Sequence, residues 1–437
     1  RQRQMCIRDS SIPGGWTADI RRNTCRHDRF LSPFSDLQLS LQKKKQFRIT
    51  IINNYKATII MQAIKTEAVN YTDLTHELGA SFASTATQSD LDGTFVFDNY
   101  QKLKEHRYFS LMVPDEFGGA GLAHSEVCDV ICIMAQYCAS TALAFSMHQH
   151  LVAATVWKYI HKGEGAPLLQ KVADKQLVLV STGARDWLGS NGEMTKVEGG
   201  YRLTARKHFA SQSIGGDIAV TSAPYKCENG NWHVLHFAVP LKNNEGVSVL
   251  DDWDVMGMRA TGSQTIAFDD VFVPEEAIVL QRPRDKFHGV WDLVIGVAMP
   301  LIMSAYVGIA ERSMDIALKI GRKYARNQQH LPYIIGKANN SKVSAMAQWK
   351  QMVSLTDDFR FKPQEDVTME MLSLKTNVAD AAIECTNLAM EAVGGQGFYR
   401  KNELERLFRD VHASQFHPLP KWDQYAFTGK RLVEAEA

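Results

Sequence analysis

The sequence lacks several features that would place a protein in a specialised class. Its seven cysteines form no CxxC pair, so neither a disulfide framework nor a paired-cysteine metal site is expected. The net charge is only +1, which gives no reason to expect nucleic acid as a partner. No apolar run approaches the roughly 20 residues that cross a bilayer, so no membrane span is expected. The G-x-S-x-G motif of hydrolases is also absent.

The first sixty residues differ from the rest of the chain. They are rich in arginine and turn residues and show no sustained apolar period. Arginine-rich composition is typical of a mitochondrial presequence, but several aspartates and the lack of an amphipathic helix argue against one. We therefore interpret residues 1–60 as a disordered extension outside the folded core, with the natural chain beginning at Met61. A cytoplasmic location is expected, and a mitochondrial one is the alternative if residues 1–60 are a presequence.

Three regions with different apolar spacing follow. Residues 61–175 place apolar residues three and four apart, which predicts helices. Residues 176–278 alternate with a period near two between Gly, Asn and Pro turns, which predicts short strands. Residues 279–437 return to helical spacing. This order predicts an α+β protein of three domains, helical, then β, then helical.

Four motifs occur in order along these regions. They are VPDEFGGAGL (113–122), KHFASQS (207–213), DVMGMRATGSQTIAFDDVFVPEEAI (254–278) and AVGGQGF (392–398). Together they resemble the motifs of the acyl-CoA dehydrogenase superfamily, over roughly Met61 to Val433. The resemblance implies an N-terminal all-α domain, a middle antiparallel β-barrel domain and a C-terminal four-helix bundle. It also implies a homotetramer or a homodimer.

The resemblance implies a flavin cofactor. Phe209 and Ser211 are two apart on an expected strand, so both can face one ligand, with Ser211 at the flavin N5 edge and Phe209 beside the ring. The cofactor-binding residues are expected to be Thr182, Ser190, Phe209, Ser211, Arg259, Ser263, Arg326, Gly394, Gly395 and Gly397. FAD is the expected cofactor. The family's Phe-Gly pair after Arg326 is missing, which leaves reduced FMN as the alternative.

The catalytic base of the family is missing from its usual places. In acyl-CoA dehydrogenases a glutamate removes the α-proton of the substrate, and such a base must lie within hydrogen-bond reach. Matched from the Arg-Asp pair of RDVHASQFHPLP, its position falls on Pro418, and the family's alternative position falls on Ala298. His417 stands beside Pro418, in a register that resembles the flavin-dependent monooxygenase branch. Imidazole suits proton transfer near neutral pH, but His417 could instead cap a helix.

Three hypotheses for the function follow. The first is a monooxygenase that uses reduced flavin and oxygen, with His417 and Ser211 as catalytic residues and a flavin reductase as partner. The second is an acyl-CoA dehydrogenase with a relocated base (Asp410, Glu405 or Asp423) and an electron-transfer partner. The third is a non-catalytic flavin or acyl-thioester binding protein. The substrate is a small molecule or an acyl-CoA. His148 and His150 either line its cavity or are partly buried helix residues.

Overall fold

The computed structural model describes residues 69–183, 187–324 and 329–434. From Asn70 onward, the described residues form one compact unit. The expected extension 1–60, Met61 and Arg326 lie outside the described residues. The division into three domains stays a prediction, and one hydrophobic core cluster includes helices that precede and helices that follow the sheet in the sequence.

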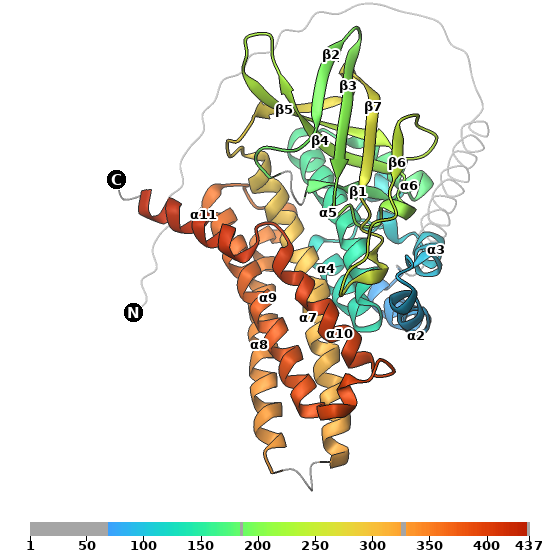
Figure 1. Cartoon of the computed structure of the whole chain (residues 1–437), viewed down its shortest axis with the longest axis vertical. Coiled ribbons are helices and arrows are strands. Elements are labelled where there is room, and N and C mark those ends of the chain that lie inside the picture. The colour runs from blue at the N-terminus through green and yellow to red at the C-terminus, as the bar shows by residue number, and fades with distance from the viewer. Residues whose placement is uncertain (1–68, 184–186, 325–328, 435–437) are drawn as a thin grey trace, which may run out of the picture. The chain divides into compact units, whose positions relative to one another are not determined.

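Among the described residues, five α-helices precede the sheet: α2 (Tyr71–Asp92), α3 (Phe97–Glu105), α4 (His124–Tyr137), α5 (Ala139–Lys162) and α6 (Ala166–Lys175). Helix α2 begins where the Asn70 side chain accepts two backbone N–H groups, and it ends at Gly93 in the left-handed conformation. Helices α4 and α5 carry buried residues on most of their surface and pack against α7 (Val290–Tyr324) of the C-terminal region. They therefore form the centre of the helical core rather than a separate layer (Figure 1).

In the part of the chain that the structure describes, eight strands form one sheet: β1 (Leu179–Ser181), β2 (Glu193–Val197), β3 (Gly200–Lys207), β4 (Ile218–Lys226), β5 (Trp232–Pro240), β6 (Val247–Val249), β7 (Ile266–Pro274) and β8 (Ile278–Pro283). The order is β6-β7-β3-β2-β4-β5-β8, with β1 paired to β4. The expected antiparallel barrel is wrong in one respect, because β1 and β2 both pair with β4 in parallel. Alternation predicts a strand but not its partner, so parallel pairing between distant strands left no local signal.

The C-terminal region holds three long helices, α7 (Val290–Tyr324), α8 (Leu331–Thr356) and α9 (Glu365–Val393), which lie side by side (Figure 1). Helix α10 (Glu403–Val411) packs on α7 and α9 as the fourth member of the expected bundle, and α11 (Lys421–Glu434) packs on α9. The turn of 3-10 helix Gly394–Phe398 lies between α9 and α10, and another over His412–Phe416 leads into α11.

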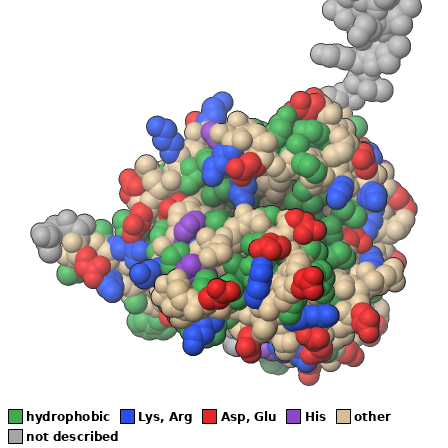
Figure 2. All heavy atoms as spheres, turned by 90° about the horizontal axis from the view of Figure 1, so that it is seen from above, with side chains coloured by type: hydrophobic (Ala, Val, Ile, Leu, Met, Phe, Trp, Pro, Cys, Tyr) green, Lys and Arg blue, Asp and Glu red, His purple; other side chains and the backbone are tan. Residues whose placement is uncertain are grey.

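Over Val290–Lys323, helix α7 is long enough and apolar enough to cross a membrane. The sequence pattern was not expected to contain such a segment. However, 94% of the most apolar 18-residue stretch of this helix is buried inside the protein, as in a helix that belongs to a hydrophobic core. On the face shown in Figure 2, acidic and basic side chains are interspersed and no large area carries one sign. This agrees with the near-zero net charge.

The close packing of α4 and α7 depends on Gly308. A Cβ at this buried position would overlap the carbonyl oxygen of Cys132 on α4 and crowd Ala135. We expect Gly308→Ala to lower the free energy of unfolding by about 2 kcal/mol, because neither backbone can move away without repacking the core. Gly336→Ala is the matched control, since Gly336 in α8 is exposed with nothing within 4 Å, and this change should stabilise the protein by up to about 1 kcal/mol. Equal denaturation midpoints for the two variants would show that the helices are farther apart.

Candidate active site

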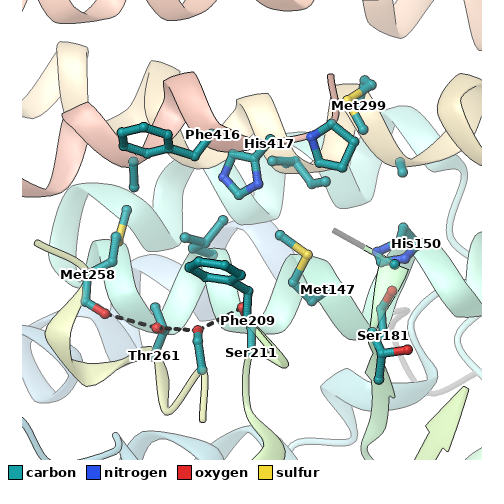
Figure 3. Close-up of a pocket in the computed structure, with 18 of the residues that line it drawn as sticks. Met147, His150, Ser181, Phe209, Ser211, Met258, Thr261, Met299, Phe416 and His417 are labelled. Atoms are coloured by element: carbon teal, nitrogen blue, oxygen red, sulfur yellow. Dashed lines mark hydrogen bonds between the residues drawn. The ribbon is translucent and has the colours of Figure 1, made fainter. Parts of the chain in front are cut away.

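A cavity of about 650 Å³ lies where the sheet meets the helices. Its walls come from β1, β4 and β5, the loops around Phe209 and Met258, helices α5 and α7, and the segment that follows α10. In Figure 3, His417 and Phe416 come from one wall, and Phe209, Ser211 and Thr261 from the opposite wall. The cavity therefore brings together residues that are more than 200 positions apart in the sequence.

A row of three hydroxyl groups forms one side of the cavity. Thr261 Oγ1 donates to the Met258 carbonyl at 2.9 Å and lies 2.7 Å from Ser263 Oγ. Ser263 Oγ in turn donates to Ser211 Oγ at 2.9 Å (Figure 3). All three side chains line the cavity and are largely buried. The row fixes the position of the Ser211 hydroxyl at the cavity surface.

Phe209 reaches the same cavity by a route that the sequence did not predict. The expected strand through residues 209–211 is wrong, because β3 ends at Lys207 and Phe209 has a left-handed φ of 58°. Ser211 N–H then bonds to the Phe209 carbonyl within a turn. The Phe209 ring remains 45% exposed in the cavity wall, with its edge toward Trp253 at a centroid distance of 6.0 Å. A large exposed ring beside a fixed hydroxyl suits a flat ligand.

A second hydroxyl wall comes from the start of the sheet. Thr182 donates to Thr221 Oγ1 at 2.7 Å, and both residues line the cavity. Ser190 lies behind this wall and bonds to the carbonyl and hydroxyl of Ser222, which does line the cavity. The buried Lys207 ammonium donates to Ser190 Oγ at 3.3 Å. Ser190 thus supports the wall rather than facing the cavity.

His417 lines the cavity and pairs with a buried tyrosine. Its Nε2 lies 2.5 Å from Tyr306 Oη on α7. Burial raises the pKa of Tyr306 well above its usual value, so the phenol stays protonated and can donate to this nitrogen. Burial, aided by Lys375 and His150, lowers the pKa of His417 to about 3. His417 is therefore a neutral imidazole near neutral pH, oriented by Tyr306.

The Arg-Asp pair before His417 has a structural task. Asp410 Oδ1 accepts the Met258 N–H at 2.5 Å, and Arg409 forms paired hydrogen bonds to Asp90 on α2 and to Glu405. Burial raises the pKa of Asp410 to about 6. Asp410 and Glu405 do not line the cavity, so neither is placed as the relocated base of the second hypothesis. Asp423 lies instead at a neighbouring hollow beside Trp187 and Phe427.

Several expected site residues lie elsewhere. Arg259 donates to the carbonyls of Asp90 and Val255, which ties the Met258 loop to α2, and it does not line the cavity. His148 also lies behind the wall, because its ring nitrogens bond to the Phe109 carbonyl and the Leu179 N–H. The glycines Gly394, Gly395 and Gly397 lie in the turn before α10, outside this chain's cavity. His150 does line the cavity.

The cavity also contains residues that the sequence analysis missed. They include Trp187, Thr221, His236, Trp253, Trp291 and Arg409. Tyr306 was missed as well, although it lies inside the apolar pattern of α7, where a buried tyrosine needs a hydrogen-bond partner. Arg409 belongs to the Arg-Asp pair of RDVHASQFHPLP, whereas the other residues carried no motif that marks them.

Comparison with known protein families confirms the resemblance. The family model of the acyl-CoA dehydrogenase N-terminal domain matches residues 74–175, and that of the acyl-CoA dehydrogenase C-terminal domain matches residues 300–422. The chain belongs to the acyl-CoA dehydrogenase superfamily. The acyl-CoA dehydrogenase fold therefore explains both the helices on either side of the sheet in the sequence and the cavity between them.

Relatives within the superfamily differ in their reactions. The candidate acyl-CoA dehydrogenase YdbM of Bacillus subtilis is 27% identical over 77% of this chain and 90% of its own length. A pigment production hydroxylase of Rhodococcus is 26% identical over 79% of this chain and 91% of its own. Among solved structures, TdsC of Paenibacillus sp. A11-2 with FMN and indole has a TM-score of 0.73 at 20% identity, covering 84% of this chain and 97% of that one. A further structure of TdsC from the same strain is FMN-bound.

Proposed function

We propose that this protein is a flavin-dependent monooxygenase that uses reduced flavin and oxygen. The observation that carries the proposal is the composition of the cavity wall: of the residues that the structure describes, no aspartate or glutamate lines it. The two positions matched to the family's catalytic glutamate, Pro418 and Ala298, do line it and have no basic atom. In acyl-CoA dehydrogenases the base that removes the α-proton of the thioester is a glutamate in that wall.

The residues present fit a flavin. Ser211 supplies a fixed hydroxyl for the N5 edge, Phe209 supplies an exposed ring for one face, and Thr182 supplies a polar group on the sheet side. FAD is the cofactor expected from the family. Gly394 and Gly395 do not line this cavity, so FAD would need these glycines from a second copy of the chain, whereas FMN would not. Separate affinities for reduced FAD and reduced FMN distinguish the two.

The bound flavin would supply two electrons for the reduction of oxygen. One oxygen atom enters the substrate and the other leaves as water, so the site must deliver protons to an oxygen atom. His417 is placed for this task, because its neutral ring can hold a proton on one nitrogen while Tyr306 donates to the other. Ser211 lies on the opposite wall of the cavity, where its hydroxyl group would orient the N5 edge of the flavin. A separate flavin reductase would supply the reduced flavin.

The proposal predicts oxygen incorporation without thioester oxidation. With reduced FMN or FAD, labelled oxygen and indole as probe, mass spectrometry should detect one labelled oxygen atom in the product. Ser211→Ala should lower this yield at least about 10-fold, because the cofactor edge loses its hydroxyl partner. Mixing the oxidised flavoprotein with a panel of acyl-CoA thioesters without oxygen should leave the flavin absorbance unchanged. Rapid bleaching by a thioester would overturn the proposal in favour of a dehydrogenase.

A further inference from the structure

His236 marks a distinct end of the cavity. It lies on β5 directly across from Ser222 of β4, and both residues line the cavity. Trp187 and Trp291 line the same cavity, with ring centroids 5.2 Å apart. His236 stands edge-on to Trp291 at 6.2 Å. We call His236, Trp187 and Trp291 the aromatic end of the cavity.

A buried arginine fixes the proton of His236. Arg282 on β8 is 1% exposed, and its Nε–H donates to His236 Nε2 at 2.9 Å. A guanidinium only donates, so Nε2 must be the unprotonated nitrogen, and the neutral ring carries its hydrogen on Nδ1. Burial together with the nearby Arg282 lowers the pKa of His236 to about 3, in agreement with a neutral ring. His236 is therefore held in one tautomer, and its Nδ1–H group is a donor that Arg282 does not use.

That donor is open toward the cavity. His236 Nδ1 has no hydrogen-bond partner within the described part of the chain, and it is not among the buried polar atoms sealed away from solvent. The side chain is half-buried and lines the cavity. An N–H group left without a protein partner at a cavity surface is satisfied by water or by a ligand acceptor.

The surroundings define what kind of ligand this donor would meet. Besides the two indole rings, this end is bordered by the aliphatic side chains of Val290 and Val294 at the start of α7. Arg282 donates to the carbonyls of Leu188 and Trp187 and lies over the face of Trp291, and it does not line the cavity. Flat faces, aliphatic contacts and a neutral N–H donor suit an uncharged ring that carries a hydrogen-bond acceptor.

We propose that His236, held as an Nδ1–H donor by Arg282, binds an acceptor atom of a flat, uncharged heteroaromatic substrate at the aromatic end of the cavity. The inference rests on the proposed function for the nature of the ligand, a substrate beside the flavin. In this arrangement Arg282 is a positioning residue and His236 determines specificity. Because the donor is a neutral group, recognition does not depend on a charged substrate.

Two probes of the same shape test the proposal. Quinoline carries a ring nitrogen that accepts a hydrogen bond and is uncharged at pH 8, whereas naphthalene has no acceptor. Equilibrium dialysis with oxidised, flavin-loaded protein should show quinoline binding about 5-fold more tightly than naphthalene. His236→Phe should abolish this preference while changing naphthalene affinity less than about 2-fold. The matched control is His233→Phe on the same strand, whose ring bonds to Gln281 and does not line the cavity.

A second variant, His236→Asn, distinguishes loss of the hydrogen-bond donor from loss of folding. His236→Asn places an amide N–H near the position of Nδ1, so at least half of the quinoline preference should return. Equal binding of the two probes to wild type, or an unchanged preference in His236→Phe, would overturn the proposal. These measurements involve no turnover, so they stand apart from the oxygen-incorporation assay. A normal preference without oxygen incorporation would refute the proposed reaction alone.

Discussion

Replacing His417 with alanine should reduce turnover with reduced flavin and oxygen by at least about 100-fold, since a positioned acid or base contributes about 10²- to 10⁴-fold. The neutral imidazole of His417 lies on the wall opposite Ser211, and we assign the proton transfer to this ring. Flavin affinity should change less than about 3-fold, because Phe209 and Ser211, which are assigned to the cofactor, lie on the opposite wall. Stopped-flow absorbance and flavin titration measure the two quantities separately.

Tyr306→Phe serves as the graded control. It keeps the aromatic ring in α7 but removes the hydroxyl that lies 2.5 Å from His417 Nε2. Turnover should fall about 5- to 10-fold, which corresponds to the loss of one orienting hydrogen bond of about 1 kcal/mol. If His417→Ala retained wild-type turnover, His417 would only end the preceding 3-10 turn, and the catalytic assignment would fail.

The second large effect is expected from Asp410→Ala, which should lower the free energy of unfolding by about 3 kcal/mol. The change leaves the Met258 N–H without its acceptor inside the protein and removes the carboxylate beside Arg406 and Arg409. The Met258 loop also carries Thr261 and Ser263, so flavin affinity should fall together with stability. Denaturant unfolding and flavin titration of the same preparations test both effects.

Asp410→Asn separates the acceptor from the charge, because its amide oxygen can still accept the Met258 N–H. The pKa of Asp410 is raised from 3.8 to about 6, so the folded protein holds this proton more tightly than the unfolded chain does. Its contribution to stability is therefore largest below pH 4 and is lost as the pH rises through about 6. The melting temperature of the Asn variant relative to wild type should rise between pH 5 and pH 7. An Asn variant as unstable as the Ala variant would contradict this account.

Motifs predicted the parts of the site that are local in sequence. Phe209, Ser211, Ser263 and His417 all line the cavity, because each lies in a short segment whose family pattern fixes its position in the fold. The expected backbone conformation of Phe209 was wrong, although its side chain does line the cavity. Phe209 reaches the cavity through a left-handed residue after the end of β3, which strand alternation cannot predict.

The parts that could not be predicted depend on contacts between distant strands and helices. His236 faces the cavity because β5 pairs with both β4 and β8. The alternating pattern of a strand does not predict which strands lie beside it in the sheet. Its tautomer depends on Arg282, 46 residues away. In the same way, Asp410 could be taken for a catalytic base until the structure placed the Met258 N–H against it.

The row of hydroxyls beside the cavity has a consequence for electron transfer. Thr261 has one hydrogen and two acceptors in reach, the Met258 carbonyl and Ser263. If it donates to Ser263, then Ser263 donates to Ser211, and the Ser211 hydrogen is free to point outward. If all three hydroxyls turn the other way, Ser211 offers a lone pair instead. A ring nitrogen that accepts a hydrogen bond when oxidised and donates one when reduced would thus meet a matching partner in both redox states, with no heavy atom displaced.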